Sequence, residues 1–239
     1  MELGEYIGYH TWKEWTGDAF GTFNSTEAAY FVLEMRKSGI VNINAKRVVE
    51  LGFGNGVFAG WAKQQGAIYV GTELIPELIA RGTAAGFDVQ SAACPLTSFT
   101  TNNSIDLVVA MDVFEHIDTS ALQNLLIEAG SCLRPGGLVV ARVPSGDSPF
   151  ARSIQHGDLT HRIILGSSAI RQLASQSGFV VKAIREPAFP IRGLGARVFI
   201  RRLAIVCARR IIYPLITQVL MGGGRPVLTP NLVCVLEKR

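Results

Sequence analysis

Two carboxylates, each at the end of a short apolar segment, are the first residues in this sequence that could do chemistry. Glu50 follows two valines and precedes three glycines at alternate positions, in the sequence VVELGFGNG, and Glu73 lies at the end of the apolar residues 67–74. Short apolar runs are typical of buried parallel strands, and a tight strand-to-helix turn needs glycine where a side chain would block backbone or ligand. Carboxylates there would repel a pyrophosphate but attract an ammonium group or accept hydrogen bonds from hydroxyls. The pattern predicts a site for such a ligand above the turn.

The glycine spacing is G-x-G-x-G, whereas dinucleotide-binding folds have G-x-G-x-x-G. The segment ELGFGNG resembles the first motif of class I S-adenosylmethionine-dependent methyltransferases, whose loop takes the methionine end of this cationic cofactor. The resemblance implies that Glu50 and the turn hold the amino-acid end of S-adenosylmethionine. Glu73 follows at about the twenty-residue separation expected of an acid that accepts from ribose hydroxyls. Two structural alternatives remain: a turn that only packs a helix on a strand, and Glu73 as a charge at a helix start.

The third and fourth predicted strands supply the rest of the cofactor site. The family usually has an acid after the third strand for the adenine amino group, but this chain has Ser-Ala-Ala-Cys at 91–94, which leaves the adenine contact to backbone groups or to a residue elsewhere in the chain. The sequence MDVFEHI follows the fourth strand, and doubly wound sheets bind ligands at the carboxyl ends of strands, so Asp112, Glu115 and His116 should lie beside the ligand. The expected cofactor contacts are Glu50, Leu51, Gly52, Phe53, Gly54, Asn55, Gly56, Glu73, Leu74, Ala92, Ala93, Asp112 and Val113.

Histidines are the candidates for proton transfer, because their pKa lies near neutrality. His116 either transfers a proton or hydrogen-bonds backbone beneath its loop. Loop 145–162 carries His156, Asp158 and His161 within six residues. His161 or His156, oriented by Asp158, could be the base for an acceptor hydroxyl. Alternatively, all three residues could bind a metal ion, although no fourth ligand is evident. The third alternative is a hydrogen-bonded loop in which Asp158 is a cap. The catalytic candidates are therefore His161, His156, Asp158 and His116, and we expect no metal.

The elements that would position these residues alternate between strand and helix. After the first strand, strands are predicted at 67–74, 87–92, 104–112, 138–143, 179–184 and 231–237. Helices are predicted from Ser25 to Gly39 and over 57–65, from Pro76, and over 119–133 and 167–177, the last with serine caps. The sequence LRPGGLVVARVP closely matches the turn and fifth strand of these methyltransferases. The predicted fold is α/β: a doubly wound, Rossmann-like sheet of seven mostly parallel strands with helices on both faces. The resemblance implies that the last strand runs antiparallel between the fifth and sixth.

Composition sets the broad class of the protein. The chain is 48% hydrophobic and 18% charged, with mean hydropathy +0.27, net charge +4 and pI near 9.0. Its four cysteines are far apart, which fits reduced thiols and gives no disulfide or zinc framework. The N-terminus lacks a basic-then-apolar signal pattern. We expect a cytoplasmic protein of one methyltransferase domain, 1–239.

Two segments lie outside the resemblance to the methyltransferase core. Residues 1–45 are rich in aromatic residues, which either cover the cofactor and shape the acceptor pocket or pack across the sheet edge; they are Tyr6, Tyr9, Trp12, Trp15, Phe20, Phe23, Tyr30 and Phe31. Residues 187–230 form a basic, apolar insertion before the last strand, since no acid occurs from 187 to 236. Its arginines are Arg192, Arg197, Arg201, Arg202, Arg209, Arg210 and Arg225.

An arginine-bearing apolar helix in the insertion has several possible uses. It could lie in a membrane interface or contact a lipid-linked substrate through 192–225, form a dimer surface, clamp an anionic acceptor, or simply cover the core with a solvated basic edge. Its longest uncharged run, 211–224, is too short to span a bilayer. Nucleic acid is disfavoured because no aromatic stacking face accompanies the arginines. Oligomerisation is left open.

The whole pattern, including GTEL and GDLTH, resembles methyltransferases of bacterial polysaccharide and surface-sugar pathways and, more distantly, quinone O-methyltransferases. The resemblance implies O-methylation of a small or sugar-type acceptor, lipid- or nucleotide-linked. Two other functions fit less of the pattern: a non-catalytic cofactor-binding partner that docks through the basic insertion, and an NAD-dependent nucleotide-sugar oxidoreductase.

Overall fold

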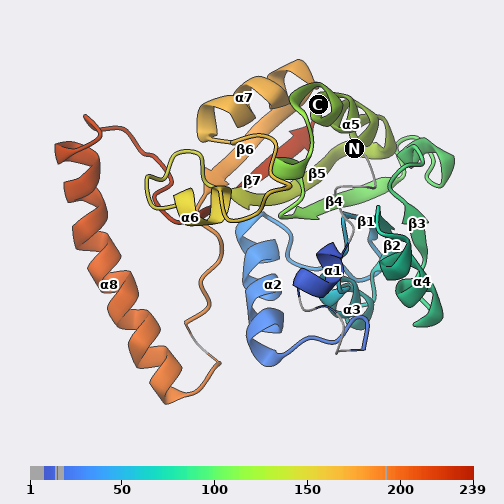
Figure 1. Cartoon of the computed structure of the whole chain (residues 1–239), viewed down its shortest axis with the longest axis horizontal. Coiled ribbons are helices and arrows are strands. Elements are labelled where there is room, and N and C mark those ends of the chain that lie inside the picture. The colour runs from blue at the N-terminus through green and yellow to red at the C-terminus, as the bar shows by residue number, and fades with distance from the viewer. Residues whose placement is uncertain (1–7, 14, 16–18, 192) are drawn as a thin grey trace.

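A seven-stranded sheet forms the centre of the computed structural model, which describes residues 8–13, 15, 19–191 and 193–239 (Figure 1). The strand order is β3-β2-β1-β4-β5-β7-β6, and only β7 runs antiparallel to its neighbours, β5 and β6. The strands are β1 (Arg47–Leu51), β2 (Ile68–Glu73), β3 (Val89–Ser91), β4 (Ile105–Met111), β5 (Leu133–Pro144), β6 (Phe179–Arg185) and β7 (Asn231–Lys238). The predicted fold class, including the place of the antiparallel last strand, is confirmed.

Helices cover both faces of the sheet (Figure 1). On one face, α5 and α7 bury leucine and isoleucine side chains against β4 and β5; on the other, α2 and α3 pack aromatic rings on β1 and β2. The helices are α1 (Tyr9–Trp12), α2 (Ser25–Lys37), α3 (Val57–Gln64), α4 (Pro76–Ala84), α5 (Thr119–Cys132), α6 (Arg152–Gln155), α7 (Ser167–Gln176) and α8 (Ala196–Val219). Two apolar layers therefore hold the strand ends, and the loops that follow them, in fixed positions.

Several element ends differ from the prediction. The sequence RPGG does not form a separate turn, because β5 already pairs with β4 at Leu133 opposite Ile105, and a bulge absorbs the extra residues. The helix predicted to start at Ser25 is capped by Asn24, whose side chain accepts from two amides of the first turn. In α7 the carboxylate of Asp147 accepts from the amide of Ser167 at 2.8 Å, so an acid from a distant loop replaces the expected serine cap.

Helix α8 stands at one side of the molecule, away from the sheet (Figure 1). None of its residues is buried, although it carries many isoleucine, leucine and valine side chains. Arg202 and Arg209 face the body, each about 5 Å from the centre of the Phe189 ring, while Arg197, Arg201 and Arg210 are exposed. Within the described residues, no helix combines the length and apolar character needed to cross a bilayer.

Candidate functional site

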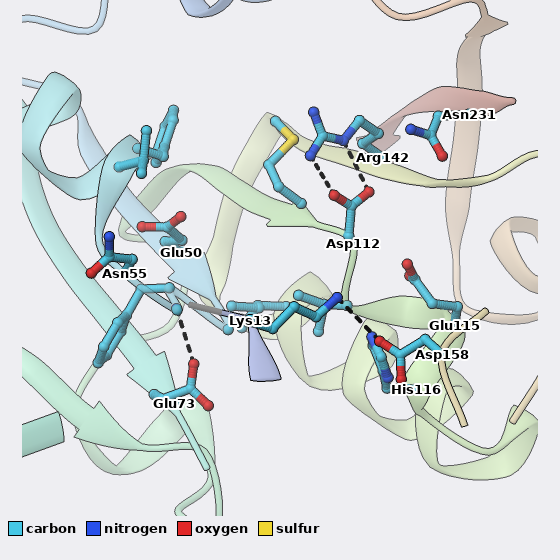
Figure 2. Close-up of a pocket in the computed structure, with 18 of the residues that line it drawn as sticks. Lys13, Glu50, Asn55, Glu73, Asp112, Glu115, His116, Arg142, Asp158 and Asn231 are labelled. Carbon is cyan, nitrogen blue, oxygen red and sulfur yellow. Dashed lines mark hydrogen bonds and ion pairs between the residues drawn. The ribbon is translucent and has the colours of Figure 1, made fainter. Parts of the chain in front are cut away.

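A cavity of about 850 Å³ opens at the carboxyl ends of β1, β2, β4 and β5. Its polar side chains form two groups, as Figure 2 shows: Glu50, Asn55 and Glu73 at one end, and Glu115, His116 and Asp158 at the other. Polar groups at both ends of one cavity allow two ligands to bind side by side.

The glycine turn forms the floor of the first end. Gly52, Gly54 and Gly56 all have positive φ, at 63°, 54° and 76°, a conformation that other residues adopt only at a cost. A Cβ atom added at Gly54 would lie 2.9 Å from Cη2 of Trp15, and one at Gly56 would lie 2.4 Å from Cζ of Phe20. Aromatic rings from the N-terminal segment therefore lie directly on the turn, and side chains in the turn would displace them.

Glu50, at the end of β1, is a buried carboxyl group that lines the cavity. Its Oε2 accepts a hydrogen bond of 2.6 Å from the hydroxyl of Tyr69 on β2, and its side chain is almost fully removed from solvent. Burial raises the pKa of Glu50, the hydrogen bond from Tyr69 lowers it, and the nearby Glu73 carboxylate raises it, which together place the pKa at about 8. An incoming cation would therefore meet a group that ionises in its presence.

Glu73, at the end of β2, is held by three backbone amides. Its Oε2 accepts from Gly54 at 3.0 Å, and its Oε1 accepts from Leu74 at 2.7 Å and Ile75 at 3.2 Å. Burial nevertheless keeps the pKa of Glu73 above its usual value, since desolvation outweighs these bonds. A carboxylate offers about four acceptor positions, so about one remains for a ligand hydroxyl without loss of a backbone bond.

Between the two ends, Asp112 is paired with Arg142 of β5 (Figure 2). Arg142 donates from Nε to Oδ1 at 2.9 Å and from Nη2 to Oδ2, and its guanidinium lies 5.6 Å from the centre of the Tyr30 ring. Asp112 has φ of 60°, in the left-handed region, and its amide donates to the carbonyl of Arg142 at 2.8 Å. Because this side chain and its backbone are both tied to Arg142, Asp112 forms part of a rigid wall rather than an isolated acceptor.

Asp158 anchors the second end of the cavity. Its Oδ1 accepts from the amide of Thr160 at 3.1 Å and from its hydroxyl at 2.6 Å, and its Oδ2 accepts from the Tyr9 hydroxyl at 2.9 Å. Lys13 Nζ lies 3.1 Å from the same Oδ2. Burial alone would raise the pKa of Asp158, but these donors outweigh it and hold the pKa well below its ordinary value. Asp158 therefore stays ionised and ties α1 to the loop after β5, 149 residues away.

The two histidines of this end lie against each other, with ring centres 4.7 Å apart. His116 Nδ1 lies 2.9 Å from the hydroxyl of Thr160, and burial, together with the charge of His161, lowers the pKa of His116 to about 4. His161 Nδ1 lies 3.0 Å from the carbonyl of Gln155, while its Nε2 lies 4.0 Å from Oε1 of Glu115. Both rings are held by their Nδ1 atoms, which fixes their orientation in the cavity wall.

The structure brings together nearly all of the residues that the sequence suggested for the site. Gly56 and Ala93 do not line the cavity, although Gly56 begins α3, and His156 is exposed outside it. His156 is therefore not positioned as a base. The expected residues that line the cavity are Glu50, Leu51, Gly52, Phe53, Gly54, Asn55, Glu73, Leu74, Ala92, Asp112, Val113, His116, Asp158 and His161.

Sequence reasoning missed Lys13 and Arg142, two of the charged residues that line the cavity. Arg142 lies within the apolar sequence LVVARVP, and a charge in a buried strand needs an acidic partner nearby, so this signal was available. Lys13 carried no such signal, because its partner Asp158 is distant in the sequence. Among the N-terminal aromatic residues, Tyr9, Trp12, Trp15, Tyr30 and Phe31 line the cavity, Phe20 and Phe23 pack against the core, and Tyr6 lies outside the described residues.

Comparisons with known proteins give the family and the fold. A family model described as "Methyltransferase domain" matches residues 21–184, and no curated protein matches the sequence. Similar solved structures include a SAM-dependent methyltransferase from Archaeoglobus fulgidus, with TM-score 0.61 and 18% identity over 85% of this chain and 91% of that one. A SAM-dependent methyltransferase from Mesorhizobium loti gives TM-score 0.57 and 19% identity over 88% and 98%. The 1,6-didemethyltoxoflavin-N1-methyltransferase of Burkholderia thailandensis, with S-adenosylhomocysteine bound, gives TM-score 0.56 and 16% identity over 98% and 86%. At these identities the solved structures show a shared fold.

Proposed function

The chain belongs to the methyltransferase domain family and its cofactor is S-adenosylmethionine, and we propose that it methylates a hydroxyl oxygen of a small or sugar-type acceptor. The observation that carries the proposal is the two-ended cavity. Buried carboxylates and a glycine turn at one end suit a cationic, hydroxyl-bearing cofactor. At the other end, the imidazoles of His116 and His161 suit an acceptor that must lose a proton.

The residues of the first end fit the cofactor chemically. The carboxyl group of Glu50 would bind the ammonium group of the methionine part, and the remaining acceptor position of Glu73 would take a ribose hydroxyl. A Cβ atom added at Gly52 would lie only 2.7 Å from Cγ2 of Val113. Glycine at this position therefore keeps a side chain out of the space between the turn and Val113. The cofactor supplies a methyl group on a positively charged sulfur, which is already a good leaving group.

The contribution of this chain is then mainly positioning, together with removal of the acceptor proton. Holding two reactants in line lowers the barrier without any covalent intermediate. His161 is the proposed base, because its Nδ1 is bound to a carbonyl oxygen and must carry hydrogen, which leaves the lone pair on Nε2. Asp158 acts as a positioning residue, since both of its oxygens already accept hydrogen bonds or an ion pair.

We further propose that the acceptor is lipid-linked, in a polysaccharide or surface-sugar pathway, and that α8 places the protein at the membrane surface. Exposed apolar side chains and the outward arginines Arg197, Arg201 and Arg210 suit an anionic bilayer interface. Arg202, which lines the cavity, would lie near an anionic acceptor group, whereas Arg192 lies outside the described residues. Peripheral binding would bring a lipid-linked sugar to the open side of the cavity.

The test is a methyl-transfer screen of purified protein against lipid-linked sugars, nucleotide sugars and quinol precursors, with and without vesicles. We expect transfer to a hydroxyl of a sugar-type acceptor, and a lower KM with vesicles that contain anionic lipid. Saturable cofactor binding without transfer to any acceptor would instead indicate a non-catalytic partner protein. Transfer to nitrogen alone would overturn the assignment of the acceptor.

The part played by α8 is tested separately. The double change Ile211→Ser and Leu215→Ser removes two apolar side chains that are 67% and 58% exposed, so it should not disturb the core. We expect it to weaken sedimentation with anionic vesicles at least tenfold and to leave turnover of a water-soluble acceptor unchanged. Val41→Ser, at a residue 84% exposed in another part of the molecule, is the matched control. Equal vesicle binding by the α8 variant and the control would contradict the proposal.

A further inference from the structure

Glu115 has a buried carboxyl group that the proposed reaction does not use. It lies in a short 3-10 helix, Phe114–His116, after β4, and only 2% of the residue is exposed. Among the residues that the structure describes, neither carboxyl oxygen has a hydrogen-bond partner. A buried carboxyl group with both oxygens unsatisfied is costly to maintain, and it calls for a ligand that occupies the space in front of it.

The hydrogen bonds around Glu115 determine which nitrogen of each neighbouring histidine carries the lone pair. The hydroxyl of Thr160 has one hydrogen, which it donates to Asp158 Oδ1 at 2.6 Å, so it accepts from His116 Nδ1 at 2.9 Å. The carbonyl of Gln155, 3.0 Å from His161 Nδ1, can only accept. Both Nδ1 atoms therefore carry hydrogen, and both Nε2 atoms carry a lone pair. Metal-binding histidines have this arrangement, in which the second nitrogen is bound to a carbonyl or a carboxylate-linked group.

The three side chains converge at one point. One potential ligand atom from each of Glu115, His116 and His161 lies within 4.8 Å of the others, and His161 Nε2 is 4.0 Å from Glu115 Oε1. Ligands at about 2.0–2.2 Å from an ion lie roughly 3.0–3.6 Å from one another, so closure of the group needs movements of about 1 Å. The backbone also joins the two segments, because the amides of Arg162 and Ile163 donate to the carbonyl of Glu115 at 2.8 and 3.2 Å.

We propose that Glu115, His116 and His161 bind one divalent transition-metal cation of the zinc, manganese, cobalt or iron(II) class. Two imidazole nitrogens and one carboxylate oxygen suit these ions better than magnesium, which prefers oxygen ligands. Three protein ligands leave coordination positions open toward the cavity, as in catalytic rather than structural sites. Asp158 is not a ligand, because its oxygens are occupied by Thr160, Tyr9 and Lys13.

The role of the cation rests on the proposed O-methylation. The acceptor hydroxyl oxygen would coordinate the ion, and its proton would pass to solvent water because the positive charge lowers its pKa. One oxygen lone pair then forms the bond to the methyl carbon, while the carbon–sulfur electron pair stays with sulfur, which leaves as a neutral thioether. In the metal-bound protein His161 is a ligand, and the ion replaces it as the group that activates the hydroxyl. His161 would thus act as the base only in metal-free protein and as a ligand only in metal-bound protein.

Metal binding can be measured without cofactor or acceptor, so it is independent of the proposed function. We would treat the full chain with chelator, titrate it with Zn²⁺, Mn²⁺, Co²⁺ and Mg²⁺ by calorimetry, and record the visible absorption of the Co²⁺ form. We expect one equivalent of transition metal bound, weaker Mg²⁺ binding, and a Co²⁺ spectrum that reports nitrogen ligands. Glu115→Gln and His161→Gln should each weaken binding by about 10–100-fold or more, whereas His156→Gln, an exposed histidine outside the cavity, should bind as the wild type does.

Circular dichroism of each variant separates loss of the site from loss of the fold. Absence of binding of all four cations to folded wild-type protein would overturn the proposal, and so would unchanged binding in both cavity variants. If metal binds but methyl transfer by the chelator-treated protein is as fast as that of the metal-loaded protein, the catalytic role fails and the assignment of His161 as base holds. Loss of transfer on chelation, with recovery on adding the metal, supports the whole proposal.

Discussion

Binding of S-adenosylmethionine should release a proton from Glu50. At neutral pH this buried carboxyl group, which faces Tyr69 and Glu73, is mostly protonated, because its pKa is about 8. An ammonium group placed against it would favour the ionised form. We therefore expect about 0.9 protons to be released per cofactor bound at pH 7, from the fraction protonated at a pKa one unit higher.

Loss of the Glu50 proton also makes the cofactor affinity depend on pH. Ionising a group of pKa about 8 at pH 7 costs about 1.4 kcal/mol, and at pH 6 about twice that. The apparent Kd should thus fall about ninefold between pH 6 and pH 7, since the protonated excess falls from about 100 to about 10. This range lies below the pKa of an ordinary α-amino group, about 7.7–8.0, so the ligand keeps its charge.

Calorimetry at pH 6.5 in two buffers of different ionisation enthalpy measures the released proton directly. Glu50→Gln keeps the shape of the side chain and can still accept from Tyr69, but it has no proton to lose. We expect this variant to bind more weakly at pH 7, with proton release near zero and a flat profile between pH 6 and 7. Equal proton release by wild type and variant would refute the reasoning, because it would assign the proton to another group such as Glu73.

Three further predictions concern stability and the two ends of the cavity. Because the pKa of Glu50 is raised in the folded protein, its proton stabilises the ligand-free fold fully below about pH 4.5, and this stabilisation is lost as the pH rises through about 8. Urea unfolding should therefore show an unfolding free energy that falls over this pH range in the wild type, and Glu50→Gln should lack this fall. Gly54→Ala should cost about 1–2 kcal/mol from its positive φ and weaken cofactor binding through the indole packed against it. Gly39→Ala, also at positive φ but in open space, should lower the Tm alone, and equal cofactor Kd values for the two variants would contradict this. Tyr9→Phe removes the 2.9 Å hydrogen bond to Asp158 and should raise the acceptor KM roughly 2–10-fold with the cofactor Kd unchanged, as steady-state kinetics would show.

The fold could be predicted from the sequence because each of its signals is local. Apolar runs that end at Glu50 and Glu73, with a glycine turn between them, specify parallel strands and a crossover helix without knowledge of distant contacts. The failure at residues 133–137 has a physical cause. Pro-Gly-Gly indicates a turn in isolation, but the pairing of Leu133 with Ile105 on β4 continues the strand through it.

The site was only partly predictable for the same reason. The sequence placed Asp158 and His161 over the carboxyl edge of the sheet, but it could not show that Asp158 binds Tyr9 and Lys13, which lie near the other end of the chain. Nor could it show that Thr160 lies between Asp158 and a histidine and so determines which ring nitrogen carries hydrogen. Such contacts depend on tertiary packing of segments far apart in sequence, and no local pattern encodes them.

The bridge from α1 to Asp158 also bears on how ligands leave. Lys13 and Tyr9 both end on one carboxylate oxygen, and Figure 2 shows Lys13 reaching across the middle of the cavity. A product beneath this bridge would leave more readily once the ion pair and the hydrogen bond had broken. Dissolved salt weakens partly exposed ion pairs. In a cycle limited by product departure, turnover would therefore quicken with ionic strength while the methyl-transfer step itself kept its rate.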